Sequence, residues 1–385
     1  MKLKCIGILI TCTILARPWQ LEAQIVTTQK ADNGEEVGQR VELVRAAAER
    51  GDVTAQCELA GMYYKGKGVA EDMRQAALWW RKAAEQGNSE AQNNLAAMYA
   101  AGQGVPRDAQ QAAVWVRKAA EQGNAVAQCS LGVAYATGMG IAKDFEKAAM
   151  WYRKSAEQGN ANAMFNLGAM NYNAEGMAKD VQQAVVWYRK AADRGHAEAQ
   201  SNLGVIYEKG YGVTKDLQQA AIWYRKAAEQ GYAEAQCNLG AMYYSGEGVA
   251  HDTDQAVLWL RKAAEQGHAV AQFALGAMYS TGDGVVEDTA QAMRWLHKAA
   301  EQGNAKAQCS LGVIYLTGTG VAKDATTAYA WATLASANGS AAGDKLLRLI
   351  AKDLDPGQID EGKRMARQWQ AQHEQPKAQI QSTLP

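Results

Sequence analysis

Cysteine and histidine are the residues of this chain with the most readily recognised chemistry. Four of the six cysteines stand at whole multiples of 36 residues from one another: Cys57, Cys129, Cys237 and Cys309. In a stack of 36-residue units they would therefore lie at least two units apart. Helices pack about 8–10 Å apart, whereas a disulfide needs Cα atoms within about 7 Å. We therefore expect four thiols on small, partly buried side chains, with metal binding or redox sensing as the alternative.

The other residues that could do chemistry form no recognisable constellation. The five histidines have no ligand spacing: His196, His251, His268, His297 and His373. No nucleophile, base and acid stand together. A Gly-x-Gly-Val segment resembles a phosphate-binding loop, but it recurs in nearly every unit before an Asp that is typical of a helix start. We interpret it as a turn, and predict no catalytic residue, no metal site and no cofactor.

Charged residues are balanced and follow the same repeat. The chain has 40 basic and 40 acidic residues, which argues against a nucleic-acid-binding domain, because such domains carry a basic excess. Basic pairs recur at Arg81 and Lys82, Arg117 and Lys118, Arg153 and Lys154, Arg189 and Lys190, Arg225 and Lys226, and Arg261 and Lys262. An acidic residue follows each pair within one turn, as Glu85 follows Lys82. We expect alternating charge ladders on a solvated face.

A period of 36 residues organises the chain, and it positions the residues named above. The tryptophans of this period are Trp79, Trp115, Trp151, Trp187, Trp223, Trp259, Trp295 and Trp331. A leucine column from Leu59 to Leu311 and an aspartate column from Asp72 to Asp324 keep the same spacing. No insertion interrupts the eight units, so the sequence predicts a repeat protein.

Each unit is predicted to form two helices. In the first, Ala55, Leu59 and Met62 share one face at helical spacing, after a capping residue such as Asp52. The second begins at the Asp72 column, with Gln75 three residues later, which predicts a capping box. Its buried stripe contains Trp79 and small alanines. A glycine column in the first helix is expected to mark the closest helix contacts: Gly132, Gly168, Gly204, Gly240, Gly276 and Gly312.

The recurring pattern A-x-x-x-L-G-x-x-Y-x-x-G-x-G-V-x-x-D-x-x-Q-A-x-x-W-Y-R-K-A-A-E-Q-G resembles the Sel-one-like repeat family, relatives of tetratricopeptide repeats. The resemblance covers about three quarters of the chain. It implies an all-α fold, a right-handed α/α superhelical solenoid of eight 36-residue helix hairpins with terminal capping helices. It also implies a concave inner surface and a role as an adaptor in protein assemblies. Bacterial members are often exported and connected with the envelope or with host contact.

We expect five segments along the chain. Residues 1–23 are a predicted signal peptide, and residues 24–50 a polar leader and capping helix in which Leu43 occupies the tryptophan column. Residues 51–338 form the eight repeats. Residues 339–375 hold two capping helices, over 341–353 and 356–373, and residues 376–385 a disordered tail.

The N-terminus has the features of an export signal. Lys2 and Lys4 precede an apolar run of roughly 12 residues, which is too short to span a bilayer, where about 20 are needed. We predict cleavage after Ala23, with cleavage after Ala16, an uncleaved anchor, or a lipoprotein at Cys12 as alternatives. The expected product is a periplasmic or secreted monomer without an integral membrane segment.

A partner is expected on the side of each first helix that lies opposite Leu59. Projection of the helix places the columns of Thr54, Cys57, Gly61 and Tyr64 there. These columns vary between units and contain aromatic and amide residues, as protein-binding surfaces do. The predicted groove residues are Tyr64, Phe165, Tyr172, Glu208, Asn238, Tyr244, Phe273 and Leu316. Neutral variation on a solvated face is the alternative interpretation.

The fourth unit differs from the others. Asn171 replaces the usual Tyr, Ala174 the first loop glycine, and Met177 the usual Val. Either a local kink or sequence drift would account for this.

Three functions follow as hypotheses. The first is an exported scaffold, not an enzyme, that binds a partner protein or peptide through the concave groove and binds no nucleic acid. The second is a cell-wall- or β-lactam-directed hydrolase, although no catalytic set supports it. The third is a virulence protein that binds a host factor.

Overall fold

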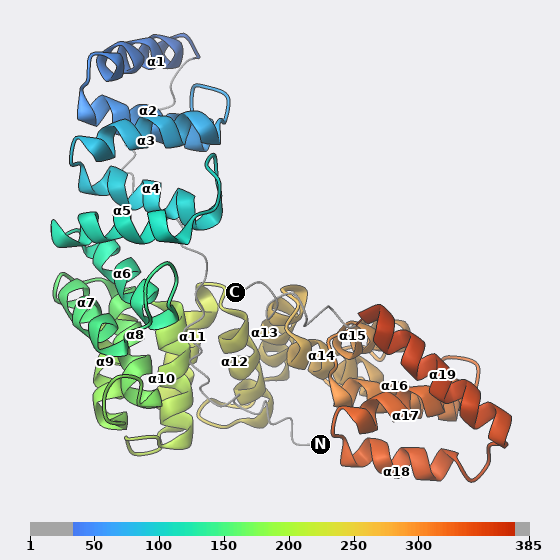
Figure 1. Cartoon of the computed structure of the whole chain (residues 1–385). Coiled ribbons are helices and arrows are strands. Elements are labelled where there is room, and N and C mark those ends of the chain that lie inside the picture. Colours follow the sequence, from blue (N-terminus) through green and yellow to red (C-terminus); the bar gives the residue numbers. More distant parts are fainter. Residues whose placement is uncertain (1–33, 374–385) are drawn as a thin grey trace. The chain divides into compact units, whose positions relative to one another are not determined.

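The computed structural model describes residues 34–373, and every regular element within that range is an α-helix. The expected all-α repeat architecture is therefore confirmed (Figure 1). The predicted signal peptide, residues 24–33 of the leader and the C-terminal tail lie outside the described residues. The described chain divides into two units, residues 34–199 and residues 200–373. Within the described range, no helix combines the length and apolar character needed to cross a bilayer.

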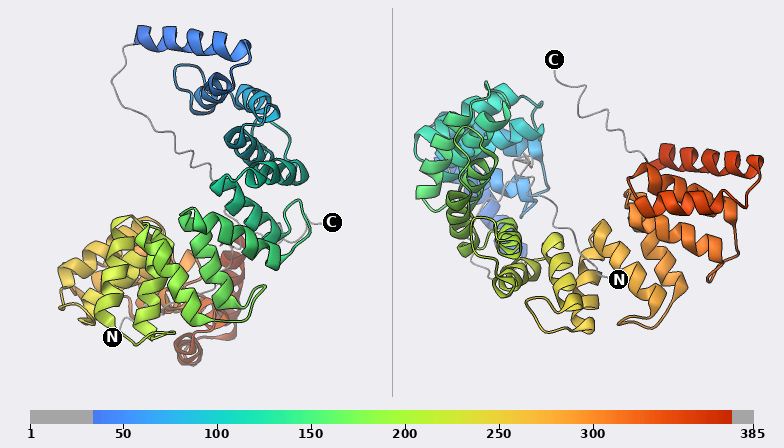
Figure 2. Two further views of the ribbon diagram at one scale, coloured as in Figure 1. Left: turned by 90° about the vertical axis from the view of Figure 1, so that its left-hand side faces the viewer. Right: turned by 90° about the horizontal axis from the view of Figure 1, so that it is seen from below.

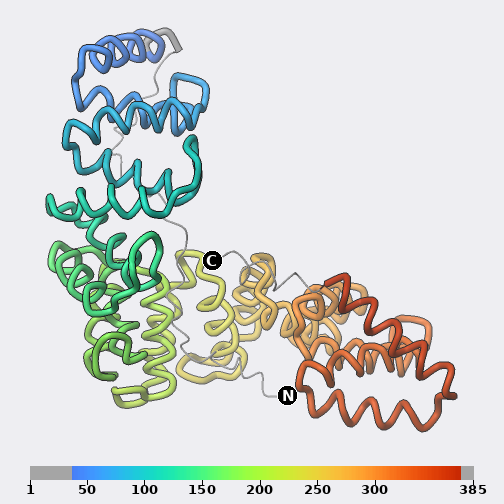
Figure 3. Tube along the Cα trace, viewed as in Figure 1, coloured from blue at the N-terminus to red at the C-terminus, as the bar shows by residue number. Residues whose placement is uncertain are grey.

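Each repeat contains two helices of 13 residues. The first, the A helices, are α2 (Val53–Lys65), α4 (Ser89–Ala101), α6 (Ala125–Thr137), α8 (Ala161–Asn173), α10 (Ala197–Lys209), α12 (Ala233–Ser245), α14 (Ala269–Thr281) and α16 (Ala305–Thr317). The second, the B helices, are α3 (Met73–Glu85), α5 (Ala109–Glu121), α7 (Phe145–Glu157), α9 (Val181–Asp193), α11 (Leu217–Glu229), α13 (Thr253–Glu265), α15 (Thr289–Glu301) and α17 (Ala325–Ala337). Within each unit the hairpins follow one another in chain order (Figures 2 and 3).

The A helices begin and end where the sequence predicts. Asp52 caps α2, because its side chain accepts a hydrogen bond from the Ala55 amide. In two repeats histidine replaces this cap: the Nδ1 atoms of His196 and His268 accept from the amides of Ala199 and Ala271. The helices end at a left-handed residue, such as Gly66 with φ of 63°, a conformation that glycine adopts without strain.

The B helices use half of the predicted capping box. Asp72 Oδ1 accepts from the Gln75 amide at 3.0 Å, as predicted. The reciprocal bond would need the Asp72 amide, but this amide donates to the Tyr63 carbonyl at 3.0 Å. Since the equivalent Asp amide in every later repeat also bonds to the end of its A helix, the Gln side chain has no amide left to satisfy. The capping Asp thus joins the two helices of each hairpin.

The loop of the fourth repeat keeps the backbone of the others. Ala174 adopts φ of 62°, and it is the one non-glycine residue with positive φ among residues 34–373. Asn171 is buried, and its amide donates to the Leu167 carbonyl. The substitutions therefore leave a strained alanine in a loop that keeps the usual left-handed helix end.

Ala174→Gly is expected to stabilise the chain by about 1 kcal/mol, because a left-handed conformation costs alanine and not glycine. Urea unfolding followed by circular dichroism would measure this. Gly210→Ala, at the equivalent position of the next repeat with φ of 75°, is the matched reverse change and should destabilise by a similar amount. A loss of stability in Ala174→Gly would contradict the assigned backbone.

The core is built from the predicted columns. The leucine column of the A helices is at most 1% exposed, from Leu59 to Leu311. The glycine column does mark tight helix contacts: a methyl group added to Gly132 would lie 2.6 Å from the ring of Tyr152. The loop glycines are also packing positions, because a methyl group on Gly104 would lie 1.9 Å from the Met73 carbonyl oxygen of the preceding repeat. This contact agrees with their interpretation as structural turns.

A buried ladder of glutamines joins successive helices, and the sequence analysis did not identify it. Gln236 is 3% exposed; its Nε2 donates to the Ala228 carbonyl of the preceding B helix at 3.0 Å. Its Oε1 accepts from Gln266 Nε2 at 2.7 Å. The same pairing links Gln56 to Gln86, Gln92 to Gln122, Gln128 to Gln158, Gln200 to Gln230 and Gln272 to Gln302. In the fourth repeat both partners change together, to Met164 and Arg194.

Additional helices flank the repeats. At the N-terminal side, α1 (Gly34–Glu49) contacts α2 as a B helix contacts the next A helix, since Gln56 Nε2 donates to the Ala48 carbonyl. Leu43 nevertheless stands 72% exposed, unlike the tryptophans of its column. At the other side, α18 (Ala341–Ile350) and α19 (Pro356–His373) both pack against α17. α18 ends three residues before the predicted boundary.

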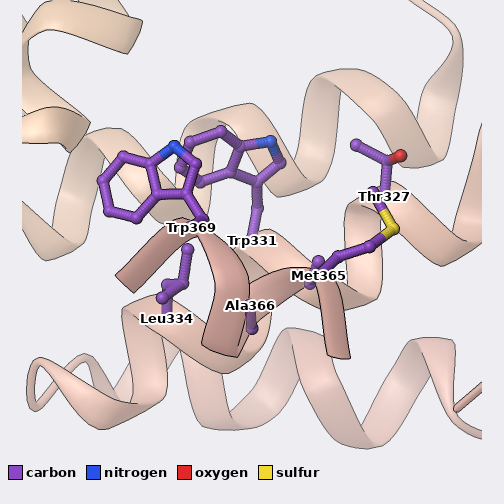
Figure 4. A pocket seen from close by; sticks show the side chains of 7 residues that line it. Thr327, Trp331, Leu334, Met365, Ala366 and Trp369 are labelled. Atoms are coloured by element: carbon purple, nitrogen blue, oxygen red, sulfur yellow. The ribbon is translucent and has the colours of Figure 1, made fainter. Parts of the chain in front are cut away.

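α19 packs on α17 through two tryptophans. Figure 4 shows Trp369 of α19 beside Trp331 of α17, and their ring centroids lie 5.1 Å apart. Leu334 and Met365 line a small pocket next to them, with a volume of about 80 Å³. α19 thus covers the outer face of α17, where Ala330 is 6% exposed.

Candidate partner-binding surface

The columns of Cys57 and Tyr64 face neighbouring helices more than solvent. Tyr64 is half-buried, and its ring centroid lies 5.4 Å from that of Trp80 in the B helix of the same repeat. Phe165 lies 5.6 Å from Tyr188 and stacks on His196 at 4.7 Å. These aromatic side chains are therefore engaged in packing within the chain.

Two predicted groove residues are buried, and this part of the prediction is wrong. Phe273 is 6% exposed and belongs to a core cluster with Leu296 and Leu311. Asn238 is 4% exposed, and its Nδ2 atom has no hydrogen-bond acceptor. Neither side chain is accessible to a partner in this structure, because the adjacent helices cover them.

The remaining predicted residues are half-buried and have partners within the chain. Lys179 Nζ lies 5.0 Å from the centre of the Tyr172 ring. Glu208 accepts a hydrogen bond from the Tyr224 hydroxyl at 2.8 Å. The Tyr244 hydroxyl donates to Asp283 Oδ2 of the next repeat at 2.6 Å, and this hydrogen bond raises the pKa of Tyr244.

Leu316 packs beside α18, against the core cluster that contains Leu346 and Ile350. The structure does not bring the eight predicted residues together into one site, and each of them has a local role.

On the A helices, the columns of Thr54 and Lys65 are exposed or half-buried in every repeat. The first reads Thr54, Glu90, Val126, Asn162, Glu198, Glu234, Val270 and Lys306. The second reads Lys65, Ala101, Thr137, Asn173, Lys209, Ser245, Thr281 and Thr317. Val133 and Val313 lie between these columns, and Val313 is 43% exposed. We call the two columns, together with Val133 and Val313, the A-helix face. The sequence analysis included the first column and missed the second.

The outer face of the B helices has a repeating composition instead. An aliphatic residue at one column is 40–47% exposed in six successive repeats: Leu78, Val114, Met150, Val186, Ile222 and Leu258. The basic pairs beside it have contacts that the sequence analysis did not predict. Lys82 Nζ lies 3.8 Å from the centre of the Trp79 ring, and Arg81 donates to the Tyr99 hydroxyl of the next repeat. Arg225 and Arg261 likewise donate to Tyr243 and Tyr279 of the next repeat, so these arginines help to pack the repeats.

The four described cysteines are thiols and form no disulfide, as predicted. Cys129 and Cys237 are buried, and Cys57 and Cys309 are half-buried. Burial raises the pKa of Cys57 to about 11 and that of Cys129 to about 12. Because the thiolate is the reactive form, these side chains are poor nucleophiles near neutral pH. Among the residues that the structure describes, no three His, Cys, Asp or Glu side chains are grouped to hold a metal ion.

Equivalent tyrosines of the B helices differ in one hydrogen bond. The hydroxyl of Tyr152 is buried without a partner, whereas the Tyr224 hydroxyl donates to Glu208. We expect Tyr224→Phe to destabilise the chain by about 1–2 kcal/mol, because it removes a bond to a charged group. Tyr152→Phe should leave stability unchanged or raise it by up to about 1 kcal/mol, since it removes an unsatisfied buried hydroxyl. Urea unfolding of both variants tests this, and equal losses would contradict it.

Comparison with known proteins is consistent with the geometry. The Sel1 repeat family matches eight consecutive segments: residues 53–88, 89–124, 125–160, 161–196, 197–232, 233–268, 269–304 and 305–340. A Sel1 repeat protein from Oxalobacter formigenes is 32% identical, with 84% of this chain and 95% of that chain covered and a TM-score of 0.60. A protective antigen present in uropathogenic Escherichia coli strains, which displays an SLR fold, is 33% identical, with 88% of each chain covered and a TM-score of 0.48. No curated protein matches at a significant level. Eight contiguous matches over residues 53–340, in the register of the observed hairpins, establish that the chain belongs to the Sel1 repeat family.

Proposed function

We propose that this protein is an exported scaffold that binds a partner protein through the A-helix face. Sel1 repeat proteins are generally protein-interaction scaffolds, which supports the class of function. A helical hairpin cannot bury its apolar stripe alone, so successive hairpins stack and present the same positions side by side. Such an array provides an extended surface for another macromolecule.

The observation that carries the proposal is the contrast between the two faces. The outer B-helix positions repeat the same types, aliphatic and then Arg-Lys, in six successive repeats. On the A-helix face, one column changes from Glu90 to Val126 to Asn162 within three repeats. The variation supports recognition of one particular partner, with exposed valines supplying apolar contacts and the charged positions supplying specificity.

The location of the partner follows from the predicted signal peptide. An exported product would meet proteins of the bacterial envelope or, if it is released, proteins of a host. Both belong to the same proposal of protein binding, and they differ in where the partner is found.

The test is a crosslinked pull-down with the full chain, from an envelope fraction and from host secretions. Val126, on the A-helix face, is 52% exposed, and Val114, on the outer B-helix face of the preceding repeat, is 47% exposed. Val126→Glu should reduce capture of the partner at least tenfold, because it places a charge in an apolar contact. Val114→Glu is the matched control and should capture the partner as the wild type does.

Among residues 200–373, Val313 on the A-helix face is 43% exposed and Leu258 on the outer B-helix face is 44% exposed. Val313→Glu and Leu258→Glu therefore form an equivalent pair. Loss of capture in Leu258→Glu and Val114→Glu, with capture retained in the A-helix variants, would move the binding site to the outer face. Capture of no protein by the wild type from either source would overturn the scaffold proposal.

A further inference from the structure

The residue that caps α14 can gain a proton, unlike most of its equivalents. In the same column, an amide oxygen that does not titrate caps four other A helices: Asn88, Asn124, Asn160 and Asn304. His268 caps α14 instead, since its Nδ1 atom accepts from the Ala271 amide at 3.3 Å. A ring nitrogen accepts only while it carries no hydrogen. This cap therefore requires the neutral ring, with its hydrogen on Nε2.

The other ring nitrogen of His268 is bonded to the preceding repeat. Nε2 lies 2.7 Å from Oε2 of Glu234, in the first turn of α12. Because Nδ1 accepts from Ala271, Nε2 must be the donor, and the neutral ring bridges two successive A helices. The side chains of His268 and Glu234 are 15% and 29% exposed, so salt screens this contact less than a contact between fully exposed groups.

Few other charged groups surround the ring. The last turn of α13 carries Lys262 and Glu265, and both are exposed. The first turn of α14 contains no charged residue. From the C-cap of α15, the neutral Gln302 reaches this region and donates to the Gly267 carbonyl at 2.8 Å. Among the described residues, the Glu234 carboxylate is therefore the charged group in direct contact with the ring.

Protonation changes the two contacts of the ring in opposite directions. A hydrogen on Nδ1 would face the hydrogen of the Ala271 amide, so that bond is lost. The new positive charge would also lie at the N-terminus of α14, where the helix dipole disfavours it. The contact with Glu234 becomes an ion pair and is strengthened. A charged ring should therefore stay with Glu234 and release the first turn of α14.

The release would be confined to this turn and would alter the A-helix face. The Gln272 amide donates to the His268 carbonyl at 3.0 Å, and Gln272 Nε2 donates to the Ala264 carbonyl at 3.0 Å. Neither bond involves the ring, so the rest of α14 keeps its anchor. Val270 of the A-helix face lies in the released turn, and Glu234 of the same face would have its charge neutralised.

We propose that His268 is a pH-sensitive cap that, when protonated, keeps Glu234, releases the first turn of α14 and so changes the A-helix face. Histidine is the side chain whose charge ordinarily changes between about pH 5 and 8. The inference rests on the proposed function only in taking the A-helix face as the binding surface. Its test needs no partner, so failure of the switch and failure to capture a partner are separate results.

The experiment measures hydrogen exchange of the Ala271 amide by NMR in the full chain, at about pH 7.5 and about pH 5. After correction for the intrinsic effect of pH on exchange, the protection factor of this amide should fall about fivefold at the lower pH, as loss of a cap predicts. The Gln272 amide is the internal control and should keep its protection. A long-range ¹H–¹⁵N spectrum should place the ring hydrogen of His268 on Nε2 at the higher pH and on both nitrogens at the lower pH.

Two variants separate the cap from a general effect of acid. His268→Asn introduces the cap of four other repeats, so the protection of the Ala271 amide should be about the same at both pH values. Glu234→Gln removes the carboxylate that favours the charged ring, so the release should need a lower pH. The proposal is overturned by unchanged Ala271 protection in the wild type, by an equal loss in His268→Asn, or by release at an unchanged pH in Glu234→Gln. A hydrogen on Nδ1 at the higher pH would overturn it as well.

Discussion

Gly132→Ala is expected to lower the free energy of unfolding by about 1–3 kcal/mol, although alanine is the better helix former. The added methyl group would lie 2.6 Å from two ring carbons of Tyr152. That ring is fully buried, so it cannot move aside without disturbing its neighbours. Since a close-packed interior resists added volume, the clash should outweigh the gain in helix propensity. Urea unfolding followed by circular dichroism measures the loss.

The chain contains the matched control for this prediction. The second repeat carries Ala96 where the third carries Gly132, and Val116 where the third carries Tyr152. Tyr152→Val alone should cost about 3–5 kcal/mol, as other large-to-small core changes do. In that background, Gly132→Ala should change sign and stabilise by about 0.5–1 kcal/mol, because the clash is gone and the helix propensity remains. A loss of the same size in both backgrounds would show that the ring does not limit the position.

Gln266→Leu is expected to destabilise the chain by about 1–3 kcal/mol, because it leaves the buried Oε1 atom of Gln236 without a hydrogen-bond donor. Gln266 Nε2 is the donor to Gln236 Oε1 at 2.7 Å, and Gln236 is 3% exposed. Removal of the donor leaves a buried amide oxygen without a partner. Thermal and urea unfolding should both report the loss, and an unchanged midpoint would contradict the assigned ladder.

The fourth repeat supplies the compensated version of this pair. Met164 and Arg194 stand at the two ladder positions, and Arg194 donates to the Lys190 carbonyl of its own helix. The double variant Gln236→Met with Gln266→Arg should therefore lie within about 1 kcal/mol of the wild type, since replacing both partners leaves no orphaned acceptor. The coupling between the two positions should be about 1–2 kcal/mol. Strict additivity of the single changes would show that they act independently.

Much of the fold was predictable because it is local and repeated. The Asp72 cap, the glycine ends of the A helices and the leucine column each depend on a few neighbouring residues. Repetition made each signal visible eight times. The Asp72 amide shows the limit, because its bond to the Tyr63 carbonyl depends on how two helices meet. A capping box predicted from the sequence of one helix does not take into account a carbonyl of the preceding helix that competes for the same amide.

The candidate surface was predicted less well, for a geometric reason. α4 packs against both α3 and α5, and an A helix with B helices on two sides exposes only a narrow strip. Projection on a single helix treats everything opposite Leu59 as solvent-facing. It therefore placed Phe273 and Asn238 in a groove, whereas both are buried. The paired changes at the ladder positions, Met164 with Arg194, were a visible signal of contact that the sequence analysis did not use.

The sequence by itself determined the repeat length, the boundaries of the helices within the repeats, the family and the absence of disulfide pairing among the four described cysteines, because each follows from spacing along the chain. The tertiary structure alone decided which side chains are accessible, which rings receive a lysine, and where Trp331 is left with a pocket under α19. Spacing fixes the direction of a side chain relative to its own helix. Exposure and pairing depend on the neighbouring helices, whose distances arise only when the repeats are stacked.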